Sequence, residues 1–217
     1  MDTIFALATA NGKAGVSIVR ISGPDAENAL NALSSLAVPI GRPSVRSLVG
    51  KDGTHIDEAM VVRFAKPHSF TGEDVVELNV HGSIAVVQAV LRELSAIQNL
   101  RHADAGEFTR RALENNRLDI SKVEGLADLI DSETEAQRTQ ALRVLSGELG
   151  NLTNYWREKL VRAASLIEAT IDFADEEVPI DVSEEVIDII KEIIDSITKE
   201  INGSVIAERV KSGFEVA

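Results

Sequence analysis

The chain has 217 residues, of which 44% are hydrophobic and 26% charged, a composition typical of a globular protein with an aliphatic core. It contains no cysteine, which excludes a disulfide framework, a Cys-ligated metal and a cysteine nucleophile. The net charge is −13, and the acidic excess falls mainly after residue 120, which argues against strong nucleic-acid binding by the chain alone. The first residues do not resemble a signal peptide and no segment is apolar enough to span a bilayer, so we expect a cytoplasmic location without membrane contact.

The first half of the chain predicts strands mixed with helices. Helical spacing of apolar residues predicts one helix after Pro24 and a second over 83–97, with Ser83 as its N-cap. Asp52-Gly53 is typical of a hairpin turn. β-branched and alternating runs predict strands at 16–22, 44–50, 58–65 and 73–82. The order strand–helix–strand–strand–strand–helix indicates an α+β domain, which we expect to span residues 1–118.

The second half predicts only helices. A short helix at 105–116 is followed by nearly continuous helical periodicity to residue 173, with a break expected at Gly147 or Gly150. After a loop at 174–181, a last helix is predicted to start behind Ser183 and to carry one apolar stripe, formed by Val186, Ile190, Ile193, Ile197, Ile201 and Val205. We expect a helical domain over 119–212. The final residues, 213–217, contain "FEVA", which looks like a strand cut short and suggests a truncated chain.

The most unusual stretch is "PHSFTGEDVVELNVHGS", residues 67–83. Because side chains alternate across a strand, Val76, Leu78 and Val80 share a core face, while Glu77 and His81 lie on the other. That polar face is either solvated or one wall of a binding pocket. In a pocket, a carboxylate could accept two hydrogen bonds from the planar N–H edge of an amino-pyrimidine or pterin.

Several arginines can also be interpreted in two ways. Arg20, inside an apolar strand, either reaches out to water from an edge or is paired with an anion. Arg110, Arg111 and Arg117 are either cations at a helix C-terminus or an anion contact in a cleft between domains. No dinucleotide or P-loop glycine pattern occurs, and the four histidines lack the spacing of metal ligands. We therefore expect no metal site.

Four segments, in unbroken order from residue 2 to about 177, resemble the tRNA-modification GTPase family called MnmE or TrmE. They are "DTIFALATANGKAGVSIVRISGP", "PHSFTGEDVVELNVHGS", "AGEFTRRALENNRLDISKVEGLADLID" and "EATIDFADEE". The resemblance implies a folate-binding, dimerising α+β domain, similar to that of the glycine-cleavage aminomethyltransferase. It also implies a helical domain into which a G domain is inserted, so that residues 213–217 would begin that missing G domain.

The resemblance further implies a function and a site. The family works with an FAD-dependent MnmG-type partner and adds an aminomethyl or carboxymethylaminomethyl group to the wobble uridine of tRNA. The carbon comes from 5-formyl- or 5,10-methylene-tetrahydrofolate, and the family's folate contacts fall on Arg20, Glu77 and Arg117, the last usually a lysine. GTP, K⁺ and Mg²⁺ belong to the full-length protein, and we expect no GTP hydrolysis by this chain alone. The alternative is a non-catalytic module for dimerisation or partner binding.

Overall fold

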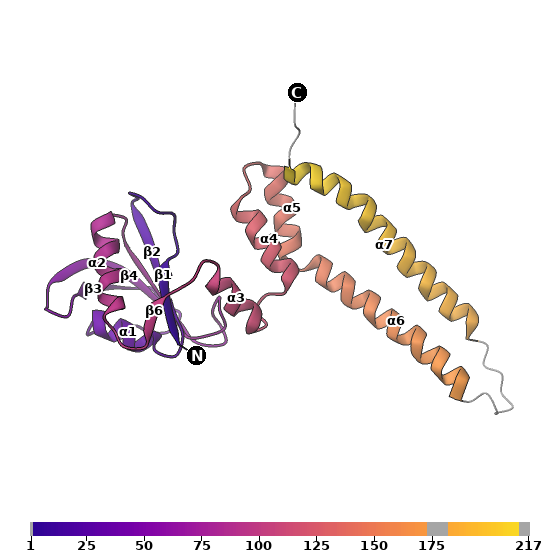
Figure 1. The fold of residues 1–217 in the computed structure, drawn as a ribbon, viewed down its shortest axis with the longest axis horizontal. Coiled ribbons are helices and arrows are strands. Elements are labelled where there is room, and N and C mark those ends of the chain that lie inside the picture. The colour runs from indigo at the N-terminus through magenta and orange to yellow at the C-terminus, as the bar shows by residue number, and fades with distance from the viewer. Residues whose placement is uncertain (1, 173–181, 213–217) are drawn as a thin grey trace, which may run out of the picture. The chain divides into compact units, whose positions relative to one another are not determined.

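The computed structural model describes residues 2–172 and 182–212, with side-chain surroundings for 2–171 and 182–203. The chain divides into two compact units, residues 1–118 and 119–217. The predicted α+β and helical classes are confirmed (Figure 1). The predicted loop at 174–181, the strand start at 213–217 and the side chain of Val205 lie outside the described residues.

The N-terminal unit is built on one mixed sheet, with strand order β3-β4-β5-β2-β1-β6 among the described residues. Neighbouring strands are antiparallel except β1 and β6, which are parallel. The strands are β1 (Thr3–Leu7), β2 (Val16–Ser22), β3 (Ser44–Val49), β4 (His55–Phe64), β5 (Val75–His81) and β6 (Leu100–His102). The sequence predicted β2, β3, β4 and β5 but neither β1 nor β6, and β4 begins three residues earlier than expected.

Two helices, α1 (Ala26–Leu33) and α2 (Ile84–Ser95), cover one face of this sheet and enclose the core. Ser83 caps α2 as predicted, accepting a hydrogen bond from the backbone nitrogen of Val86 at 3.3 Å. The buried cluster joins residues of both helices to β2, β4 and β5, and includes Leu30, Val90, Leu94, Val19, Ile21, Val61, Leu78 and Val80. Burying each such side chain contributes about 1.5–3 kcal/mol, so this face dominates the stability of the unit.

The opposite face of the sheet, here called the outer face, carries Arg20 on β2 and Glu77 on β5. Near Ser22, the outer face is covered by the loop 65–74, whose Thr71 and Glu73 bond to Ser22. Helix α3 (Glu107–Glu114), the short helix predicted at 105–116, holds this loop through a bond from Arg111 to Glu73. The other end of the outer face is open: Val45 of β3 and Met60 of β4 pair across the strands and are 67% and 45% exposed. The Arg20–Glu77 row lies between the covered and the open parts.

The helical unit contains α4 (Ile120–Ile130), α5 (Glu135–Leu145), α6 (Glu148–Asp172) and α7 (Ser183–Ser212). The predicted break at Gly147 is confirmed, since this residue adopts φ +87° between α5 and α6, whereas Gly150 lies inside α6. The nearly continuous periodicity predicted before it has a further break, between α4 and α5. Thr134 and Gln137 form a capping box that starts α5 and ends the continuity after α4.

Helix α7 packs on α6 through a small apolar cluster. Ile189 and Ile193 of α7 are buried with Ala163 of α6, and Trp156 packs against them. Of the predicted stripe, Ile193 is buried in this cluster and Val186 packs against it, whereas Ile201 is 59% exposed. Ile189, which the stripe did not include, is buried as well.

Candidate ligand-binding site

Strand pairing brings Arg20 and Glu77 together. Ser17 and Val19 of β2 point into the core, so Arg20 points to the outer face, where the β2–β5 register places it directly opposite Glu77. The Nε of Arg20 donates to Glu77 Oε1 at 2.8 Å, and Nη2 lies 2.8 Å from the same oxygen. Their side chains remain 23% and 20% exposed, so the pair is reachable from solvent.

Two aromatic rings flank the guanidinium of Arg20. Its central carbon lies 5.0 Å from the ring centre of Phe70, in the loop 65–74, and 5.6 Å from that of Phe108, on α3. Both distances are within the range of a cation–π interaction. Sequence reasoning missed these two residues. The only signal was the scarcity of aromatic residues, since the chain has just six Phe.

Arg117 follows α3 and packs against the loop 65–74 rather than against the Arg20–Glu77 pair. Gly72, at φ +79°, brings that loop so close that a Cβ there would lie 3.1 Å from Arg117 Cγ. Among the described residues, no ion pair holds the guanidinium of Arg117, which is exposed. The structure thus joins Arg20 to Glu77 directly and connects Arg117 to them only through the loop that carries Phe70 and Gly72.

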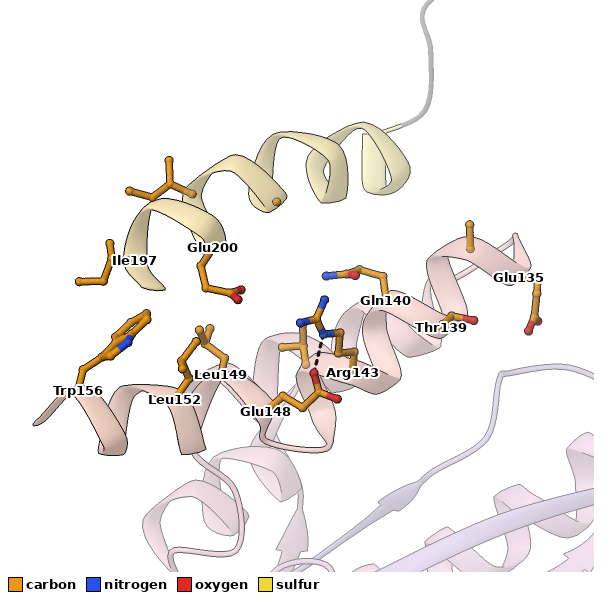
Figure 2. Close-up of a pocket in the computed structure, with 14 residues that line it drawn as sticks. Glu135, Thr139, Gln140, Arg143, Glu148, Leu149, Leu152, Trp156, Ile197 and Glu200 are labelled. Atoms are coloured by element: carbon orange, nitrogen blue, oxygen red, sulfur yellow. Dashed lines mark hydrogen bonds and ion pairs between the residues drawn. The ribbon is translucent and has the colours of Figure 1, made fainter. Parts of the chain in front are cut away.

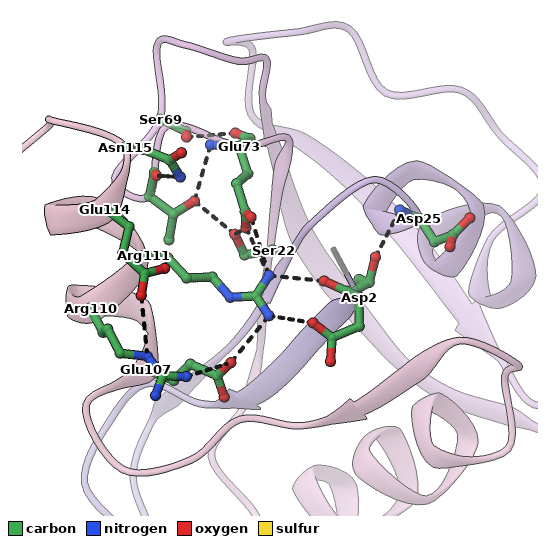
Figure 3. A network of polar contacts seen from close by, with 12 residues as sticks. Asp2, Ser22, Asp25, Ser69, Glu73, Glu107, Arg110, Arg111, Glu114 and Asn115 are labelled. Atoms are coloured by element: carbon green, nitrogen blue, oxygen red, sulfur yellow. Dashed lines mark hydrogen bonds and ion pairs between the residues drawn. The ribbon is translucent and has the colours of Figure 1, made fainter.

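A second polar cluster ties α3 to the start of the chain (Figure 3). Arg111, whose side chain is 7% exposed, bonds to Asp2, Glu73 and Glu107. The interpretation of Arg111 as a free anion contact between domains is therefore wrong, because its donors are used inside the N-terminal unit. Arg110 is engaged as well, 3.3 Å from Glu107. No short sequence motif indicates this cluster, because Asp2 and Arg111 are 109 residues apart.

Glu107 is the most deeply buried acid of that cluster, with a side chain that is 1% exposed. Hydrogen bonds from Arg101, at 2.6 and 2.8 Å, lower the pKa of this carboxyl to about 2. Burial opposes ionisation, but the backbone nitrogen of Asp104 and the guanidinium of Arg111 also donate to it. Every oxygen of Glu107 is occupied, so the cluster is a structural clasp rather than a reactive centre.

At the far end of β5, His81 contacts Asp57. The ring Nδ1 of His81 lies 2.7 Å from Asp57 Oδ1, and the backbone nitrogen donates to Oδ2 at 2.7 Å. Burial disfavours the charged carboxyl, yet these bonds outweigh it and hold the pKa of Asp57 below its ordinary value. No hydroxyl or thiol among the described residues completes a nucleophilic triad with this pair, so its clearest role is to fix the end of β5.

The helical unit contains a groove of about 1180 Å³ between α5, α6 and α7. Figure 2 shows Leu149, Leu152 and Trp156 on α6 facing Ile197 on α7, with Arg143 and Glu148 paired at its edge. The groove has mainly apolar walls, and its charged lining residues include Arg143, Glu148 and Glu200, of which Arg143 is paired with Glu148. Within the described residues there is no group of three potential metal ligands, and no helix long and apolar enough to cross a membrane.

Comparison with known proteins accounts for both units. The model of the family described as "GTP-binding protein TrmE N-terminus" matches residues 3–117, and that described as "MnmE helical domain" matches residues 120–215. Curated relatives named tRNA modification GTPase MnmE are similar over the whole chain. Those of Roseobacter denitrificans, Cereibacter sphaeroides (strain ATCC 17029) and Parvibaculum lavamentivorans are 57%, 55% and 47% identical.

The whole chain is covered in each of these three matches, but only 51%, 50% and 50% of the relatives' own lengths. The chain thus spans about half the length of the curated relatives it matches. The two matched regions also meet between residues 117 and 120, where the structure divides. From these matches, the chain belongs to the MnmE (TrmE) family of tRNA modification GTPases and comprises its N-terminal and helical domains.

Proposed function

We propose that this chain is the part of a tRNA modification GTPase that binds a tetrahydrofolate derivative and dimerises. The observation that carries the proposal is the carboxylate of Glu77, which is partly exposed and paired with Arg20, whose guanidinium lies within 6 Å of the ring centres of Phe70 and Phe108. Its Oε1 is taken by Arg20, and no described residue donates a hydrogen bond to Oε2. A carboxylate oxygen with free lone pairs is the acceptor that the N–H edge of a reduced pterin requires.

The residues present fit 5-formyl- or 5,10-methylene-tetrahydrofolate. The ligand has a flat ring system with N–H donors at one end and a glutamate carboxylate at the other. Glu77 suits the donors, Phe70 and Phe108 offer apolar surface, and Arg117 offers a cation for the carboxylate. When bound, the folate supplies a one-carbon unit. The residues of this chain bind and orient it.

We further propose the setting in which this site works. Two copies associate through the N-terminal unit, for which the open part of the outer face, around Val45 and Met60, provides exposed apolar surface. The assembly acts with an FAD-dependent MnmG-type partner on the wobble uridine of tRNA. GTP, K⁺ and Mg²⁺ serve the full-length protein. Since no P-loop motif occurs in these 217 residues, this chain by itself does not hydrolyse GTP.

Calorimetric titration of the chain with 5-formyltetrahydrofolate tests the binding proposal. We expect saturable binding that weakens on the order of tenfold or more in Glu77→Gln, because a charged hydrogen-bond acceptor is lost. Glu58→Gln is the matched control, since Glu58 is an exposed acid on β4, on the same face of the sheet. Equal affinities in the two variants would remove Glu77 from the site. Dimerisation without any folate binding would favour the scaffold alternative.

A further inference from the structure

The contacts of Arg20 distinguish it from a free anion-binding cation. Its Nε and Nη2 both lie 2.8 Å from one oxygen, Glu77 Oε1, and the other oxygen of that carboxylate is left out of the pair. A guanidinium that binds a carboxylate as a fork usually engages both oxygens, with two parallel N–H bonds. Here the one-sided arrangement holds the Glu77 carboxylate in place and leaves Oε2 able to accept a hydrogen bond.

The two phenylalanines keep this arrangement in place. Phe70 and Phe108 come from separate elements, the loop 65–74 and α3, yet both rings lie within 6 Å of the same guanidinium carbon. Because the rings attract the cation and fill the space around it, Arg20 loses the freedom to swing toward a ligand. The two cation–π contacts therefore favour the held rotamer of Arg20.

From this geometry we infer that Arg20 is a positioning residue, held by Phe70 and Phe108, that presents Oε2 of Glu77 to an N–H donor of the ligand. The inference rests on the proposed function and makes it more specific. Glu77 meets the pterin edge through one oxygen instead of two. The cation that meets the anionic tail of the folate is Arg117, which is exposed and, among the described residues, in no ion pair.

A double-mutant cycle separates positioning from direct contact. If Arg20 acts through Glu77, Arg20→Met and Glu77→Gln each weaken binding of 5-formyltetrahydrofolate on the order of tenfold, and the double variant binds no more weakly than Glu77→Gln alone. Arg117→Met is the internal control, because its loss should multiply with that of Glu77→Gln. Multiplying losses for Arg20 and Glu77 would overturn the inference.

A shortened ligand tests which arginine meets the tail. With 5-formyltetrahydropteroate, which lacks the glutamate, Arg117→Met should no longer weaken binding, whereas Arg20→Met should weaken it as before. The reverse result would assign the tail to Arg20 and overturn the inference, while leaving the proposed folate site intact.

A measurement without ligand tests how Arg20 is held. In ¹⁵N spectra of the chain, the Nε–H of Arg20 should give a resolved, slowly exchanging signal that is lost in Glu77→Gln and weakened in Phe70→Leu and in Phe108→Leu. Far-UV circular dichroism checks that the variants are folded. A signal indifferent to both leucine variants would refute the aromatic clamp. If wild type binds no folate, the proposed function fails, and this spectrum still decides whether Arg20 is held.

Discussion

Replacing Glu107 by Gln should destabilise the N-terminal unit by about 3 kcal/mol at neutral pH. The pKa of this carboxyl falls from its ordinary 4.5 to about 2 in the folded protein, chiefly because Arg101 donates hydrogen bonds to it. A difference of this size corresponds to about 3 kcal/mol. The neutral amide keeps the shape of the side chain but leaves the buried guanidinium of Arg111 with one less countercharge.

The stabilisation by Glu107 should depend on pH. A carboxyl with a depressed folded pKa contributes its full stabilisation above the unfolded value, 4.5, and loses it as the pH falls toward about 2. The stability of wild type should therefore exceed that of Glu107→Gln by a constant amount above about pH 5, and the gap should close on acidification. Glu114→Gln is the control, because Glu114 is an exposed acid on the same helix, 3.9 Å from Arg110.

Urea unfolding provides the assay. With an m-value of about 1.5 kcal/mol/M, the transition of the N-terminal unit, followed by far-UV circular dichroism, should move down by about 2 M. The single Tyr and Trp of the chain, Tyr155 and Trp156, both lie on α6, so fluorescence reports the helical unit and should not change. Equal midpoints for Glu107→Gln and Glu114→Gln at pH 7, or a gap at pH 3 as large as the gap at pH 7, would refute the reasoning.

Two glycine substitutions test close backbone approaches, one in each unit. Gly82→Ala would place a Cβ 2.4 Å from the carbonyl oxygen of Ala14, so we expect a loss of about 1–3 kcal/mol in the thermal stability of the N-terminal unit. Gly15→Ala, with no atom within 4 Å of the added Cβ, should change it by less than about 0.5 kcal/mol. In the helical unit, Gly125→Ala would bring a Cβ to 2.7 Å from a backbone nitrogen of α5 and should lower the urea midpoint seen by tryptophan fluorescence. Gly150→Ala, on α6 with only an ordinary contact, should raise that midpoint, because alanine favours a helix over glycine by about 0.5 kcal/mol. Shifts of the same sign in Gly125→Ala and Gly150→Ala would contradict the packing.

Elements with local signals were predictable, and elements defined by distant partners were not. The patterns of β2, β5 and α2 lie within each segment, so the sequence predicted these elements, and for β5 also the buried face formed by Val76, Leu78 and Val80. β6 has only three residues, and β1 is buried on most of its length, so neither shows alternation. The capping box at Thr134 did have a sequence signature, Thr-x-x-Gln, that would have located the break before α5.

The candidate site divides in the same way. Arg20 and Glu77 each stood out as charged residues in apolar strands, and the resemblance to the family joined them to Arg117. Their direct pairing depends on the register of two strands that lie 57 residues apart, and a shift of one residue would have placed them on different faces. The aromatic neighbours depend on how a loop and α3 fold over the sheet, for which no short motif exists.

The position of β1 has a consequence for how the protein is made. Thr3 pairs with Leu100, and Asp2 bonds to Arg111, so the first strand finds its last partners only after more than a hundred residues have been synthesised. At about 5–20 residues per second, the nascent chain waits roughly 5–20 s with this strand incomplete on one edge. The sheet of the N-terminal unit is therefore completed late in synthesis, because β1 is made early and pairs with β6 last.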